Sequence, residues 1–125
     1  MTTPVLVIED NEQNLYLTRY LLTAHGYDSI EARDGPSGIA LARHHRPGLI
    51  LLDIQLPTMN GYEVARQIRT HRELDATKIV AVTSHAMVGD RERSLASGCD
   101  GYIEKPIDPA TFIQEIRSVL PAKAT

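Results

Sequence analysis

Short runs of Val, Ile and Leu recur along the chain, and longer segments with helical spacing separate them. The first, third and fourth runs are continuously apolar, which is typical of strands that helices cover on both faces. We therefore predict a parallel sheet. Its strands should span residues 5–8, 29–32, 49–52 and 79–82, with a fainter fifth strand at 101–103.

Helical spacing and stop signals predict a helix after each of these strands. The last predicted helix has Asp108 as its N-cap, Pro109 as its first residue and Pro121 as its stop. Five strand–helix repeats with right-handed crossovers predict an α/β fold in which a doubly wound, five-stranded parallel sheet carries five helices. The predicted helices span residues 12–25, 36–45, 61–71, 89–96 and 109–120.

Composition excludes several classes of protein. A net charge of -3 gives no long-range attraction to nucleic acid, and no apolar run approaches the roughly 20 residues that cross a bilayer. The single Cys99 cannot form an internal disulfide, and residues 1–4 carry no basic cluster of the kind that begins a signal peptide. We expect a cytoplasmic protein that binds neither nucleic acid nor membrane directly.

Polar residues collect at the predicted carboxyl ends of the strands, where doubly wound sheets bind ligands. Each alone could be a helix cap or a loop residue, but several carboxylates at one edge repel one another unless a cation joins them. Mg²⁺ prefers oxygen ligands. Three carboxylates and one lysine would leave two negative charges, which the two positive charges of Mg²⁺ balance. The residues are Glu9 and Asp10, Asp53, Thr83 and Lys105.

Asp53 ends the most apolar predicted strand and is the candidate nucleophile, which would form an acyl phosphate. Glu9 and Asp10 would hold the metal together with Asp53, and the backbone carbonyl of Gln55 could add a ligand. Lys105, as a point charge, and the hydroxyl of Thr83 would stabilise the oxygens of a phosphoryl group. This set therefore predicts Mg²⁺-dependent phosphoryl transfer.

Four separated motifs carry a family resemblance: Glu9-Asp10, LILLDIQLPTMNG around Asp53, IVAVTS around Thr83, and GYIEKPI around Lys105. Together they resemble the receiver domains of response regulators over essentially the whole chain. The resemblance implies a CheY-like fold, Mg²⁺ dependence, and phosphorylation of Asp53 by a histidine kinase or phosphotransfer protein. It also implies that the chain catalyses only its own phosphorylation and dephosphorylation.

The resemblance further implies a conformational switch. Thr83 would move toward the phosphoryl group and Tyr102 would turn inward, which alters the face formed by the fourth helix, fifth strand and fifth helix. A downstream protein would bind that face. The resemblance also implies a cis peptide between Lys105 and Pro106, and the variable positions Gln55 and His85 are expected to influence dephosphorylation.

We predict a receiver domain over residues 1–121 and a short tail at 122–125, acting alone as a monomer in a phosphorelay. Two alternatives stay open. The domain could come from a hybrid histidine kinase or larger regulator. It could also be a metal-dependent phosphatase with an aspartyl-phosphate intermediate, although such enzymes usually carry a second aspartate where this chain has Gln55.

The first predicted helix suggests where a phosphodonor docks. Helical spacing places Leu17, Tyr20 and Leu21 on one side, which we expect to face the sheet. Leu15 and Leu22 fall on the opposite side and are predicted to form an apolar strip in solvent. We expect this strip to contact the helical hairpin of a histidine kinase or phosphotransfer domain.

Overall fold

The computed structural model describes residues 4–84 and 88–120. Five strands and five α-helices alternate, with one short 3₁₀ helix, η1, before the fourth strand. None of the helices in these two ranges is long and apolar enough to cross a membrane. In chain order the elements are β1 (Val5–Ile8), α1 (Glu12–Ala24), β2 (Ser29–Ala32), α2 (Gly35–His45), β3 (Leu49–Asp53), α3 (Gly61–Arg69), η1 (Arg72–Leu74), β4 (Lys78–Thr83), α4 (Asp90–Ala96), β5 (Gly101–Glu104) and α5 (Phe112–Val119).

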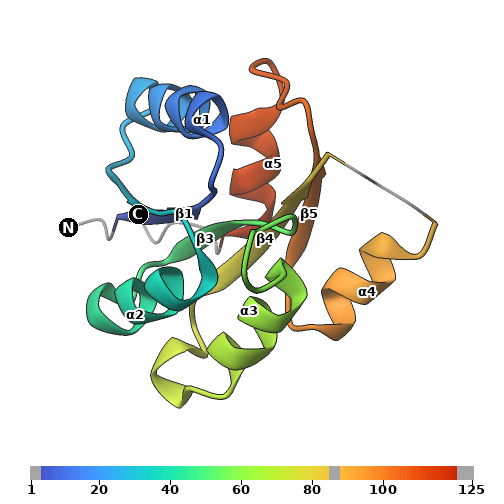
Figure 1. Ribbon diagram of the computed structural model, residues 1–125. Helices are drawn as coiled ribbons and strands as arrows, with labels where there is room; N and C mark the ends of the chain where they lie inside the picture. The colour runs from blue at the N-terminus through green and yellow to red at the C-terminus, as the bar shows by residue number, and fades with distance from the viewer. Residues whose placement is uncertain (1–3, 85–87, 121–125) are drawn as a thin grey trace.

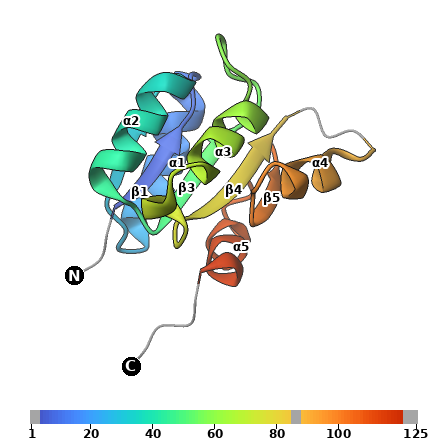
Figure 2. The ribbon, with the colours of Figure 1, turned by 90° about the horizontal axis from the view of Figure 1, so that it is seen from below.

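All strands are parallel in one sheet with the order β2-β1-β3-β4-β5. Helices α1 and α5 cover one face of the sheet, and α2, α3 and α4 lie on the other side (Figure 1). Viewed from below, α2 and α3 pass in front of the sheet (Figure 2). The predicted doubly wound α/β fold is confirmed, and the chain reverses its direction across the sheet between β1 and β3.

The core consists of two apolar layers, one on each face of the sheet. Leu6 and Ile8 of β1 point into the layer under α2 and α3, whereas Val5 and Val7 point into the layer under α1 and α5. Every residue of β1 and of β3 is buried. Two-sided burial explains why these strands are continuously apolar rather than alternating.

The solvent-facing strip predicted on α1 is wrong. Leu15 is 2% exposed and Leu22 is 0% exposed, and both pack in the layer shared with α5. The buried face of α1 also includes Thr18 and Leu21, and the burial of Leu21 was predicted. Tyr20, assigned to the sheet-facing side by helical spacing, is 62% exposed because its position on the helix faces away from the sheet. Because the polar residue Thr18 lies on the buried face, the apolar pattern of the sequence did not reveal that face.

Helix α5 begins later than predicted. The Asp108 carbonyl oxygen accepts the N–H of Thr111 and of Phe112, and its Oδ1 accepts the N–H of Ala110 at 2.9 Å. Residues 109–111 therefore form turns that Asp108 caps, and the α-helix starts at Phe112. Pro121 and the predicted tail lie outside the described residues.

Candidate active site

The carboxyl ends of β1, β3, β4 and β5 bring the predicted polar residues to one edge of the sheet. Asp53 and Thr83 are the last residues of β3 and β4, and Glu9 directly follows β1. Lys105 follows β5 and donates its backbone N–H to the Thr83 carbonyl oxygen at 2.7 Å. Glu9, Asp53 and Thr83 are buried, whereas Asp10 is exposed.

Three carboxylates meet at this edge. One ligand oxygen each from Glu9, Asp10 and Asp53 can be chosen so that all lie within 4.8 Å of one another. The pKa of the Glu9 carboxyl is raised to about 7, because burial and the adjacent Asp53 carboxyl raise it by more than Lys105 lowers it. The edge therefore gathers three carboxyl groups, and the full ionisation of Glu9 is disfavoured there.

Lys105 is the cation of this cluster. Its Nζ donates to Glu9 Oε1 at 2.6 Å and lies 3.6 Å from Asp53 Oδ2. The predicted cis peptide between Lys105 and Pro106 is confirmed. The ammonium thus sits between two buried carboxylates and closer to Glu9.

The donor set fits a magnesium ion. Three carboxylates and one ammonium leave a formal charge of about -2 when all are ionised, which one divalent cation neutralises. All three candidate ligands offer oxygen, the atom that Mg²⁺ prefers. Glu9, Asp10 and Asp53 would hold the ion, and a contribution from the Gln55 carbonyl stays a prediction.

The loop after Asp53 folds back on its own strand. Gly61 donates its N–H to the Ile54 carbonyl oxygen at 3.0 Å, and a Cβ at position 61 would lie 2.7 Å from the Asp53 carbonyl oxygen. Glycine is therefore required at Gly61 by the close approach of two backbone segments. This packing fixes the backbone from which the Asp53 carboxylate projects.

Sequence reasoning assigned a backbone ligand role and an influence on dephosphorylation to Gln55, but it did not predict the contacts of the side chain. The amide Nε2 donates to Thr83 Oγ1 at 2.5 Å, and Oε1 accepts the N–H of Ser84 at 3.3 Å. The available signal was positional, because Gln55 and Ser84 each follow the end of one of two strands that can lie side by side. That β3 and β4 are neighbours is a property of the folded sheet.

Tyr102 lies on β5, half-buried beneath α4. Its hydroxyl oxygen is buried and has no hydrogen-bond partner in the described part of the chain. The Arg91 guanidinium lies 5.4 Å from the ring centroid, and burial raises the pKa of the phenol. The family resemblance implied a switch role for Tyr102, and that role stays a prediction.

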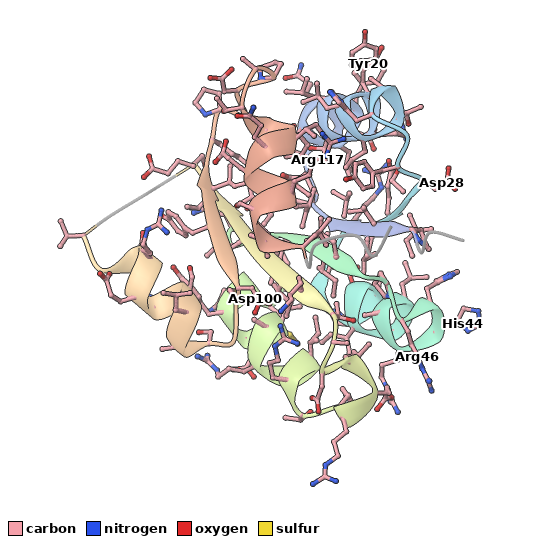
Figure 3. The ribbon with its side chains drawn as sticks, turned by 180° about the vertical axis from the view of Figure 1, so that it is seen from behind. Tyr20, Asp28, His44, Arg46, Asp100 and Arg117 are labelled. Carbon is pink, nitrogen blue, oxygen red and sulfur yellow. The ribbon has the colours of Figure 1, made fainter. Side chains whose placement is uncertain are left out.

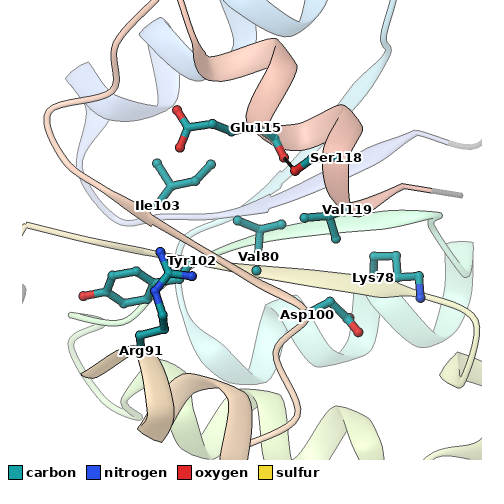
Figure 4. A pocket seen from close by; sticks show the side chains of 10 residues that line it. Lys78, Val80, Arg91, Asp100, Tyr102, Ile103, Glu115, Ser118 and Val119 are labelled. Carbon is teal, nitrogen blue, oxygen red and sulfur yellow. Dashed lines mark hydrogen bonds between the residues drawn. The ribbon is translucent and has the colours of Figure 1, made fainter. Parts of the chain in front are cut away.

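A hollow of about 500 Å³ lies around the edge strand β5 and does not contain the carboxylate cluster. Arg91 and Tyr102 border it on the α4 side, and Ser118 and Val119 border it on the α5 side (Figure 4). Its charged groups have both signs and do not converge on one point, so the chemistry is better assigned to the acidic edge. His85, the other variable position, lies outside the described residues.

Residues 5–117 match the profile of the response regulator receiver domain. The chain belongs to this family. The polar-differentiation response regulator DivK of Brucella ovis is 47% identical over 120 residues, which are 96% of this chain and 98% of that protein. The family membership sets aside the alternative of a metal-dependent phosphatase.

Solved receiver structures agree with this assignment. The chemotaxis protein CheY4 of Vibrio cholerae superposes with a TM-score of 0.90 at 26% identity, covering 96% of this chain and 100% of that one. The receiver domain of the sensor histidine kinase PA1611 from Pseudomonas aeruginosa superposes with a TM-score of 0.85 at 30% identity, covering 94% and 97%. That structure contains a magnesium ion coordinated in its active-site cleft.

Proposed function

We propose that this receiver domain accepts a phosphoryl group from a phosphohistidine onto Asp53. An Asp53 carboxylate oxygen bonds to phosphorus as the phosphorus–nitrogen bond of the donor breaks, and the departing imidazole keeps the electron pair and takes up a proton. The observation that carries the proposal is the buried Asp53 carboxylate, which has ligand oxygens of Glu9 and Asp10 within 4.8 Å and lies 3.6 Å from the ammonium of Lys105.

The surrounding residues have separate tasks in this reaction. Glu9 and Asp10 would hold Mg²⁺ together with Asp53, and the ion would supply positive charge to the incoming phosphoryl oxygens. Lys105 supplies a point charge on the other side, and the Thr83 hydroxyl is a donor for a phosphoryl oxygen. The domain performs no other reaction than its own phosphorylation and dephosphorylation.

Mass spectrometry tests the chemistry. The full chain, incubated with acetyl phosphate, should gain one phosphoryl group in the presence of Mg²⁺ and none when the metal is chelated. Asp53→Asn should fold and stay unmodified, because an amide is a poor nucleophile. Asp28→Asn is the matched control, since Asp28 is exposed and lies before β2 at the other end of the sheet (Figure 3). A base-labile phosphate on Asp53→Asn at the wild-type rate would contradict the assignment.

The histidine kinase or phosphotransfer partner needs a docking surface near Asp53, and burial of Leu15 and Leu22 excludes them from that role. Helix α1 begins two residues after Asp10, and its large exposed apolar side chains are Tyr16 and Tyr20, which are 64% and 62% exposed. Tyr20 points away from the sheet (Figure 3). These two tyrosines lie one turn apart, so they can share one partner surface.

Replacing both tyrosines by alanine should slow transfer from the phosphohistidine partner and leave the rate with acetyl phosphate unchanged. An equal loss with both donors would indicate damage to the fold or to the chemistry. Unchanged rates with both donors would remove Tyr16 and Tyr20 from the docking surface.

The signal would leave through Thr83 and Tyr102 to the surface formed by α4, β5 and α5, where a downstream protein would bind. Tyr102 supports this route, because its ring contacts Arg91 of α4 and its buried hydroxyl makes no hydrogen bond to the described residues. The monomeric state and cytoplasmic location expected from the sequence stay predictions.

A further inference from the structure

Gln55 projects from a backbone that is held on both sides. Its N–H donates to Asp53 Oδ1 at 2.9 Å. The preceding Ile54 is buried and donates its N–H to the Val82 carbonyl oxygen at 3.0 Å, and the following Leu56 is buried as well. The Gln55 side chain itself is exposed, so hydrogen bonds rather than packing determine where it points.

The side chain crosses from the loop after β3 to the end of β4. Its Nε2 donates to Thr83 Oγ1 at 2.5 Å, and its Oε1 accepts the Ser84 backbone N–H at 3.3 Å and the Ser84 hydroxyl at 3.4 Å. A backbone N–H can only donate, so the amide oxygen must face Ser84 and the amide nitrogen must face Thr83. The short bond makes Thr83 the main anchor, and the two longer bonds to Ser84 add little.

The register of the sheet creates this contact. Asp53 pairs with Val82 in the β3–β4 ladder, so the residues that follow these two leave the sheet side by side. One glutamine can therefore bind the Asp53 carboxylate through its backbone and the Thr83 hydroxyl through its side chain. Gln55 therefore connects Asp53, which would receive the phosphoryl group, with Thr83, which would respond to that group.

We propose that Gln55 is a positioning residue that restrains Thr83 and sets how readily the switch operates. The inference rests on the proposed function, because it assumes that Thr83 moves toward a phosphoryl group on Asp53. The Gln55 backbone is anchored beside Asp53. A displacement of Thr83 relative to Asp53 therefore has to break or rearrange the hydrogen bond from Gln55 Nε2 to Thr83 Oγ1. The restraint favours the unphosphorylated arrangement, and its loss shifts the equilibrium toward the switched one.

Nuclear magnetic resonance of the full chain with Mg²⁺ tests the restraint. The reporters are the amide and methyl resonances of Thr83 and the ring resonances of Tyr102. Tyr102 lies on β5, whereas the substituted residue lies in the loop after β3. Gln55→Met keeps the length of the side chain and removes its hydrogen bonds, and Gln55→Ala is a second variant. Gln13→Met is the matched control, since Gln13 is an exposed glutamine on α1 whose side chain bonds to no described residue.

Without a phosphodonor, both Gln55 variants should shift the two reporters toward their positions in wild type phosphorylated by acetyl phosphate. The expected change in the switch equilibrium is about 2- to 10-fold, which corresponds to the net strength of one ordinary hydrogen bond. Gln13→Met should leave both reporters at the wild-type positions. Movement of Tyr102 distinguishes a released switch from a local change of environment at Thr83.

Two results would overturn the restraint while leaving the phosphoryl chemistry intact. In one, acetyl phosphate shifts the wild-type reporters but both Gln55 variants keep the unphosphorylated positions. In the other, the variants shift away from the phosphorylated positions, which would mean that Gln55 favours the switched state. If acetyl phosphate adds no mass to the wild type, the proposed function fails and this inference fails with it.

Discussion

Helices α4 and α5 flank the same edge strand, β5, but different forces hold them. Helix α5 buries Phe112, Ile113 and Ile116 in the layer shared with α1. Among the described residues of α4, Ser94 alone is buried, and Leu95 is 50% exposed. The hydrophobic effect therefore anchors α5 to the sheet, whereas it contributes little to the position of α4.

Polar and aromatic contacts take the place of apolar burial at α4. The Arg93 guanidinium lies 4.3 Å from the ring centroid of Tyr62 on α3, and Arg91 lies over Tyr102 on β5. Contacts of this kind are worth about 0.5–1 kcal/mol at exposed sites. The comparison indicates that α4 can shift at low cost while α5 stays in place, so a change at Tyr102 should pass mainly to α4.

The largest loss of stability is expected when the apolar anchor of α5 is removed. Phe112→Ala deletes a fully buried ring and should lower the free energy of unfolding by about 3–5 kcal/mol. Leu95→Ala on α4 should change it by less than about 0.5 kcal/mol. Urea denaturation followed by circular dichroism measures both values. Similar losses for the two variants would show that α4 is anchored as firmly as α5.

An intermediate effect is expected at the turn that follows α4. Arg69 donates to the Gly98 carbonyl oxygen at 2.9 Å, to the Leu74 carbonyl oxygen at 3.0 Å and to Asp100 Oδ2 at 2.8 Å. Arg69→Ala removes all three bonds and should destabilise the domain by about 1–3 kcal/mol. Arg72→Ala is the control.

This substitution sharpens the comparison because it acts on the end of α4 rather than on its face. Arg72 is exposed and lies in η1, close in sequence to Arg69, and the three hydrogen bonds named above all come from Arg69. The same urea titration measures both variants. If Arg69→Ala matched Arg72→Ala, the turn after α4 would be as weakly held as the helix itself.

The smallest effect on stability is expected for a substitution on the face of α4. The reactivity of Cys99 can be used to measure it. Cys99 is buried and follows α4, and its backbone N–H donates to the Ser94 carbonyl oxygen at 3.0 Å. Burial raises the pKa of the thiol from 9.0 to about 12, so at pH 8 we expect alkylation to proceed through an opened form in which the pKa is ordinary. Arg93→Ala should change global stability by at most about 1 kcal/mol.

The rate of alkylation of Cys99 by iodoacetamide should nevertheless rise about 2- to 5-fold in Arg93→Ala, since the cation–π contact opposes opening. Arg117→Ala is the control on α5, where the arginine is exposed and donates to the Tyr27 hydroxyl at 3.4 Å. Equal acceleration by both substitutions would mean that Cys99 reports opening of the whole domain rather than of α4.

Much of the architecture could be predicted from local patterns. β1 and β2 span the predicted residues, and β3, β4 and β5 each extend the prediction by one or two residues. Continuous apolar runs mark strands that are covered on both faces, and these runs can be recognised without knowledge of their neighbours. The polar residues of the candidate site could be found for the same reason, because parallel strands place their carboxyl ends at one edge.

The orientation of α1 could not be predicted in this way. Two helical faces compete on this segment, and counting apolar side chains favours the one that contains Tyr20. In the structure Leu21 of that face is buried, but Leu15 and Leu22 are buried in the same layer and Thr18 lies among them. Which face is buried is a property of the partner surfaces, which periodicity alone does not describe.

The sequence by itself determined the order of the elements and the residues that end each strand, because backbone propensity and apolar periodicity act over a few neighbouring residues. Only the tertiary structure decided the contacts across strands: Lys105 against Glu9, the raised pKa of Glu9, and Gln55 against Thr83. These depend on distances between residues far apart in the chain, and electrostatic and hydrogen-bond energies change steeply over such distances.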